Sequence, residues 1–158
     1  MAKRDPNSLT GTIIWVLVLC LFIAGLIITG LVVRPSGALD VPKGDHAAHV
    51  RLTDYAVHGP ASLPAGKYEF VITNHGTAPH ELVIFGTKSS AAALPLRKDG
   101  SVDEENESLT SVLDSGSSLE PGETRVVFAD LTSPGHYAMV CNLPQHYHLG
   151  MHADLSVS

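Results

Sequence analysis

The sequence predicts an all-β sandwich that follows one N-terminal transmembrane helix. Residues 12–33 form an apolar run of 22 residues without a charge, whereas turns rich in proline and glycine divide the rest of the chain into short apolar or alternating segments. A chain of 158 residues, of which 44% are hydrophobic, has the size and composition of one globular domain. We therefore treat the apolar run as a separate element in front of that domain.

Residues 12–33 are long enough to cross a membrane. As a helix they span about 33 Å, against a hydrocarbon core of about 30 Å, and a helix satisfies its own backbone hydrogen bonds in lipid. Lys3 and Arg4 precede the run and Arg34 alone borders its far end, so residues 1–11 are expected in the cytoplasm and the domain at the periplasm or cell surface. The alternative is a cleaved signal peptide. Because the apolar region of a signal peptide has about 7–15 residues, we expect a retained anchor in contact with lipid.

The folded domain is expected over residues 48–158, after a linker at residues 34–47 that is rich in Pro, Gly and Asp. Tyr68, Phe70 and Ile72 alternate with other side chains, which is the pattern of a half-buried strand. Turns with Pro and Gly separate such segments at regular spacing, which favours an antiparallel sandwich. The expected strands occupy residues 49–57, 67–74, 81–85, 124–129, 136–141 and 153–157.

One segment, residues 86–119, interrupts this regular spacing as a long polar insert. Its centre, residues 103–107, is almost entirely acidic, and residues 108–113 have the composition of a short helical turn. A structureless loop of this length counts against the sandwich assignment unless it carries local structure or a function. We favour a solvated excursion between two strands over a surface that docks a partner.

The charge balance and the cysteines exclude several classes of protein. Residues 34–158 carry 8 Lys and Arg against 15 Asp and Glu, so a nucleic-acid partner is excluded by charge repulsion. The chain contains no phosphate-binding or dinucleotide-binding glycine pattern and no nucleophile elbow. The only cysteines are Cys20 and Cys141, so a disulfide scaffold is excluded. We expect Cys20 to be a buried apolar residue of the membrane segment.

The residues that carry chemistry lie near the C-terminus. Cys141, His146 and Met151 follow a C-x4-H-x4-M spacing, and His80 precedes them at the start of an expected strand. Two imidazoles, one thiolate and a thioether are the ligand set of a trigonal copper site with a weak axial sulfur. Such a set accepts both Cu(II) and Cu(I), and ligation explains a lone thiol in an oxidising compartment. We expect these four residues to bind one mononuclear copper ion.

Other histidines are interpreted as solvated. His46 and His49 lie three residues apart in and beside the linker and offer a loose metal pair, but no carboxylate or cysteine completes the set. His148 and His152 flank the copper loop, either as groups that gate a partner or a proton, or as plain rim residues.

Each of the four candidate copper ligands taken alone also has an ordinary structural explanation, so the joint spacing carries the prediction.

At these residues the sequence resembles the cupredoxins, the blue copper proteins that include azurin, plastocyanin and rusticyanin. The similarity covers residues 48–157, and residues 141–146, Cys-Asn-Leu-Pro-Gln-His, look like the azurin-type loop. The resemblance implies a Greek-key β-sandwich with one type 1 copper at its end, bound by the ligand set His80, Cys141, His146 and Met151, with the methionine as the axial ligand. Glu81 stands where azurins and plastocyanins carry asparagine, which leaves the potential open.

The resemblance implies a membrane-anchored one-electron carrier rather than an enzyme or a protein with a small-molecule substrate. No histidine flanks Cys141 as in multicopper oxidases, a dinuclear copper site needs a second cysteine, and a thiolate held by copper is not a free nucleophile. Redox proteins are expected to dock weakly on apolar rim residues, namely Leu143, Pro144 and Leu149. The alternative is a copper-binding or copper-delivery protein without electron transfer.

Overall fold

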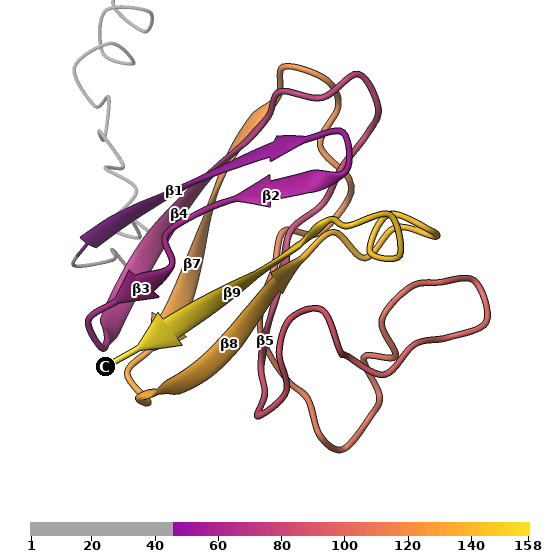
Figure 1. Cartoon of the computed structure of the whole chain (residues 1–158). Coiled ribbons are helices and arrows are strands. Elements are labelled where there is room, and N and C mark those ends of the chain that lie inside the picture. Colours follow the sequence, from indigo (N-terminus) through magenta and orange to yellow (C-terminus); the bar gives the residue numbers. More distant parts are fainter. Residues whose placement is uncertain (1–45) are drawn as a thin grey trace, which may run out of the picture. The chain divides into compact units, whose positions relative to one another are not determined.

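The computed structural model describes residues 46–158, which form a sandwich of two sheets (Figure 1). The expected transmembrane helix at residues 12–33 and almost all of the expected linker lie outside the described residues. Within residues 46–158, no helix is long and apolar enough to span a membrane. The first sheet has the order β2 (Ala56–His58), β1 (His46–Thr53), β4 (Gly66–Asn74) and β7 (Thr124–Leu131). The second has the order β3 (Ser62–Leu63), β9 (His152–Val157), β8 (Gly135–Val140), β5 (Val83–Gly86) and β6 (Thr110–Asp114).

The core between the sheets is built by alternating side chains, as the sequence predicts for β4. Tyr68, Phe70 and Ile72 are buried along β4, and Ala48, Val50 and Leu52 are buried along the neighbouring strand β1. Successive side chains of a strand point to opposite faces, so these residues share the face toward the second sheet. Their burial against Leu82, Ile84, Met139 and Leu155 stabilises the sandwich through the hydrophobic effect.

Strand pairing differs from the expected all-antiparallel arrangement. β1 pairs with β4 in parallel, from His46↔Tyr68 to Leu52↔Asn74, and β3 pairs with β9 in parallel. The remaining pairs are antiparallel. Alternation within one strand identifies the buried face but not the direction of the neighbour, which is why the prediction was wrong here. The chain crosses between the two sheets after β2, β3, β4, β6 and β7.

The segment expected to be one strand at residues 49–57 is a hairpin. β1 ends at Thr53, and Tyr55 turns the chain with a φ of 67° before β2 begins at Ala56. A positive φ is uncommon for a tyrosine and leaves no signal in the composition of the segment. β1 also begins at His46, two residues inside the expected linker.

The insert at residues 86–119 is not the solvated excursion that we favoured. It contains strand β6 where a helical turn was expected, and four of its apolar side chains, Ala91, Leu94, Val102 and Leu109, are buried. They pack on the face of β5 and β8 that points away from the main core, against Val83, Phe85, Ala138, Val140 and Tyr147. β5 is therefore buried on both faces, which explains its continuous apolar run at residues 83–85.

Candidate metal centre

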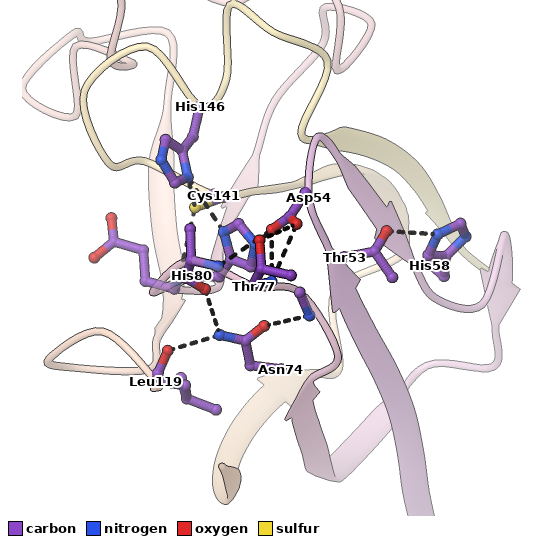
Figure 2. Close-up of polar contacts among 12 residues, drawn as sticks. Thr53, Asp54, His58, Asn74, Thr77, His80, Leu119, Cys141 and His146 are labelled. Carbon is purple, nitrogen blue, oxygen red and sulfur yellow. Dashed lines mark hydrogen bonds and ion pairs between the residues drawn. The ribbon is translucent and has the colours of Figure 1, made fainter. Parts of the chain in front are cut away.

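Three predicted ligands come together at one end of the sandwich. His80 lies in the connection between β4 and β5, Cys141 directly follows β8, and His146 lies in the loop that leads to β9. A ligand atom of each of these three residues lies within 4.8 Å of the other two. Figure 2 shows the two imidazoles and the sulfur directed toward one another. Three side chains that are distant in the sequence thus form one site.

The ligand atoms of this group lie close enough together to bind one shared metal ion. His80 Nδ1 lies 3.2 Å from His146 Nδ1, and Cys141 Sγ lies 3.4 Å from the same His146 atom. Two imidazole lone pairs directed at each other repel unless a proton or a cation lies between them. Cys141 and His80 have 0% and 1% of their surface exposed, whereas His146 is half-buried. The group is therefore open to the outside only at His146.

Met151 closes the loop that carries two of these residues. The Cys141 N–H donates to the Met151 carbonyl at 3.0 Å, and the Met151 N–H donates to the His146 carbonyl at 3.1 Å. Gly150 supplies a φ of 110°, which an L side chain rarely adopts. The Met151 side chain is fully buried in the core cluster that also contains Cys141. The structure thus places the fourth predicted residue beside the group.

His80 is held on both its backbone and its ring. Its N–H and carbonyl form a bridge with the backbone of Leu119, and its Nε2 lies 3.1 Å from Asp54 Oδ1. The Asp54 carboxylate accepts hydrogen bonds from the side chain and backbone of Thr77, which lower its pKa to about 2. A carboxylate on the outer nitrogen of a ligating imidazole fixes its tautomer and orientation. No sequence pattern indicates Asp54 as a partner of His80, because it lies in the distant turn between β1 and β2.

Asn74 and Gly76 shape the turn that leads to His80. Asn74 is fully buried and donates from Nδ2 to the carbonyls of Ala78 at 2.8 Å and Leu119 at 2.9 Å, while its Oδ1 accepts from the Gly76 N–H (Figure 2). A Cβ on Gly76 would lie 2.5 Å from His80 Nε2 and 2.5 Å from Asp54 Oδ1. Glycine is therefore required for the Asp54–His80 contact to form.

Burial sets the protonation of the groups around the sulfur. It raises the pKa of the Cys141 thiol, and the backbone N–H of Glu81 lies 3.5 Å from Sγ as a donor. Burial, together with the charges of Asp114 and Glu104, raises the pKa of the Glu81 carboxyl to about 7. Desolvation and the neighbouring imidazole lower the pKa of His146. A neutral thiol and a neutral His146 imidazole are thus favoured, and a cation that displaces the thiol proton turns the group into a strong ligand set.

The remaining histidines in the described range do not join this group. His46 and His49 are exposed, as interpreted from the sequence, and they lie on opposite faces of β1, so the alternative of a loose metal pair is not formed. The His46 ring packs on Tyr68 instead. His148 is exposed, and His152 begins β9 with its ring against Tyr147.

Several solved structures have a similar backbone. Dithionite-reduced auracyanin from the photosynthetic bacterium Roseiflexus castenholzii has a TM-score of 0.52 at 19% identity, over 72% of this chain and 96% of that chain. Auracyanin B has a TM-score of 0.52 at 20% identity, over 73% and 91%. Rusticyanin from Thiobacillus ferrooxidans has a TM-score of 0.51 at 18% identity, over 73% and 84%. The chain has the cupredoxin fold.

The backbone comparison confirms the fold that the resemblance of residues 48–157 to the cupredoxins implies. No protein-family model and no curated protein sequence matches the chain. With identities of 20% or less, the likeness concerns the fold, and the chemistry must be judged on the residues present.

The donor set at the end of this cupredoxin fold fits copper. Two imidazoles, one buried thiol and a buried methionine match the His₂Cys set with a weak axial thioether. A structural zinc site, by contrast, closes with four nitrogen, thiolate or oxygen ligands, and no fourth ligand of this kind joins the group within residues 46–158. The chemistry of the donors thus favours a copper ion over a structural zinc ion.

Proposed function

We propose that this protein is a type 1 copper protein that carries single electrons, tethered by residues 12–33 to the outer side of the cytoplasmic membrane. The observation that carries the proposal is the convergence of His80 Nδ1, His146 Nδ1 and Cys141 Sγ within 4.8 Å of one another at one end of a cupredoxin fold. A bound copper ion supplies the change of one electron between Cu(I) and Cu(II). All other properties of the site come from the residues of this chain.

In this proposal each ligand has a distinct task. Cys141 provides the strongest donor, because a thiolate shares charge with Cu(II) more than any other side chain does. His80 and His146 would hold the ion together with it. Met151, whose thioether suits Cu(I), would add a weak fourth donor that tunes the potential. Burial of the sulfur keeps water away from the site.

Partners reach the site through the half-buried edge at His146. Around it, Leu149 is 52% exposed, Tyr55 is 57% exposed, and Leu143 and Pro144 complete an apolar rim. A small apolar rim suits brief contacts, since interfaces of redox carriers are small. We propose that redox proteins dock here for electron exchange.

Tethering is the second part of the proposal and is supported by residues 12–33, an uncharged run long enough for a membrane helix. Lys3 and Arg4 before the run favour an N-terminus in the cytoplasm and a domain outside it. A tether of this kind raises the local concentration of the carrier near membrane-bound donors and acceptors.

The residues next to Cys141 support an electron carrier rather than an oxidase. Val140 and Asn142 flank Cys141, so no neighbouring histidine links the sulfur to a second metal centre. His80, Cys141 and His146 form the one group of this kind found within residues 46–158. We therefore propose no catalytic residues.

The test is an absorption and paramagnetic-resonance spectrum of the full chain in detergent after addition of Cu(II). We expect an intense thiolate-to-copper band in the visible range, lost in Cys141→Ser and kept in the matched control Cys20→Ser. A Cys141→Ser variant that stays blue refutes the assignment of the sulfur. Reversible voltammetry supports the carrier, whereas irreversible release of the metal to a chelator on reduction indicates copper delivery.

A further inference from the structure

The insert at residues 86–119 is bound to the loop that carries the candidate ligands, residues 141–151, here called the metal loop. Figure 1 shows the long segment between β5 and β6 next to the loop between β8 and β9. Asn142, adjacent to Cys141, accepts from the Val102 N–H at 2.5 Å and donates to the Val102 carbonyl at 3.2 Å and to Glu104 Oε1 at 2.5 Å. Asn142 and Val102 are both buried, so this side chain replaces a pair of backbone hydrogen bonds.

Tyr147, adjacent to His146, makes the second connection. Its hydroxyl donates to the Ala91 carbonyl at 2.7 Å and accepts from the Leu94 N–H at 3.0 Å. Its ring is buried in the same apolar cluster as these two residues. Without the insert, the ring and the hydroxyl of Tyr147 would both be exposed to water.

Gln145, on the other side of His146, makes the third connection. Its backbone N–H donates to the Asp99 carbonyl at 3.1 Å, and its Nε2 donates to the same oxygen at 2.7 Å. Gly100 allows this contact, since its φ is +79° and a Cβ there would lie 3.1 Å from the Gln145 amide nitrogen. The hydrogen bonds of the insert thus fall on the residues next to Cys141 and on both sides of His146.

We propose that the insert fixes the metal loop in its ligating conformation before any metal binds, with Asn142 and Tyr147 as positioning residues. Backbone hydrogen bonds within the metal loop, such as the one from the Met151 N–H to the His146 carbonyl, connect the loop only to itself. The insert ties the same loop to β5 and β8 through buried contacts, which hold it far more firmly than exposed ones. Ligands held in this way stay in place when the charge of the metal changes, a consequence that rests on the proposed function.

The first experiment measures amide hydrogen exchange of the copper-free full chain in detergent. Tyr147→Phe removes one hydroxyl with two buried partners, and we expect exchange in the metal loop, including the Gln145 and His146 amides, to rise about tenfold, as for loss of one buried hydrogen bond. Tyr137→Phe is the matched control, since its hydroxyl donates to the Ser133 carbonyl at 2.7 Å near the opposite end of β8. Exchange in the metal loop that rises no more in Tyr147→Phe than in the control overturns the proposal.

A second variant guards against a general loss of folding. Gln145→Ala removes an exposed amide that bonds only Asp99, and we expect a smaller rise in exchange confined to the same loop. In the copper-loaded chain, Tyr147→Phe should change the paramagnetic-resonance hyperfine splitting and the reduction potential, while Tyr137→Phe leaves both unchanged. If the paramagnetic-resonance spectra and reduction potentials of Tyr147→Phe and Tyr137→Phe are equal, Tyr147 does not act as a positioning residue. If the wild type binds no copper, the proposed function fails, and hydrogen exchange still decides the role of the insert.

Discussion

Gly76→Ala is the substitution that most directly tests the geometry around His80. The new Cβ would lie 2.5 Å from His80 Nε2, 2.5 Å from Asp54 Oδ1 and 2.9 Å from His80 Cδ2. Neither neighbour is a flexible chain end, because the imidazole is buried and the carboxylate is held by Thr77. The backbone at Gly76 has an ordinary φ, so the effect of the methyl group is steric.

The size of the effect follows from these distances. Ordinary contact begins at 3.4 Å, so relief of the overlap requires a shift of about 0.9 Å in the imidazole, the carboxylate or the turn. Losing or displacing an outer partner of a ligating histidine lowers metal affinity about 10- to 100-fold. Overpacking of a buried site also costs about 1–3 kcal/mol of stability. We expect copper affinity to fall by about 10- to 100-fold in Gly76→Ala.

Affinity is measured by competition between the copper-free protein and a chelator of known copper affinity. Gly135→Ala is the matched control, since the nearest atom to its new Cβ, on Tyr137, lies 3.9 Å away. The control should bind copper as the wild type does. Unchanged copper affinity in Gly76→Ala, with the protein folded, would refute the reasoning that the Asp54–His80 contact supports a metal ligand.

Two further predictions concern the axial residue and acid stability. Met151→Leu should keep copper and raise the reduction potential in voltammetry, because an aliphatic side chain removes a weak donor from the metal; an unchanged potential would exclude Met151 as a ligand. Hydrogen bonds lower the pKa of Asp54 to about 2 and also lower those of Asp99 and Asp130. These groups stabilise the fold fully above the ordinary aspartate pKa of about 4. The unfolding free energy of the copper-free protein, measured in urea, should therefore fall as the pH decreases from 4 to 2. A flat profile would show that these hydrogen bonds persist in the unfolded chain.

The main strands and the candidate ligands could be predicted because each leaves a local pattern. Alternation at Tyr68, Phe70 and Ile72 identifies the buried face of β4, and the spacing of Cys141, His146 and Met151 places donors at both ends of one loop. The structure confirms both the strand and the convergence of the thiol with two imidazoles. The alternation of β4 and the spacing of the metal loop are each contained in one short segment, whereas the meeting of His80 with this loop is implied by the ligand set of a copper site.

Other features that depend on two distant segments leave no local pattern and could not be predicted. The parallel pairing of β1 with β4 follows from the packing of the whole sandwich. Asp54 meets His80 across 26 residues, and an aspartate in a turn has no pattern that names its partner. In the insert, Ala91, Leu94, Val102 and Leu109 are too widely and irregularly spaced to indicate a buried face, although together they form one.

The parallel pairing of β1 with β4 has a mechanical consequence. A pulling force directed along β1 acts on its pairing with β4, which extends from His46↔Tyr68 to Leu52↔Asn74. Hydrogen bonds across that direction share the load and must break together, in contrast to a hairpin that is peeled open one bond at a time. The first strand is therefore a strong attachment point, and it leads directly to the turn where Asp54 contacts His80.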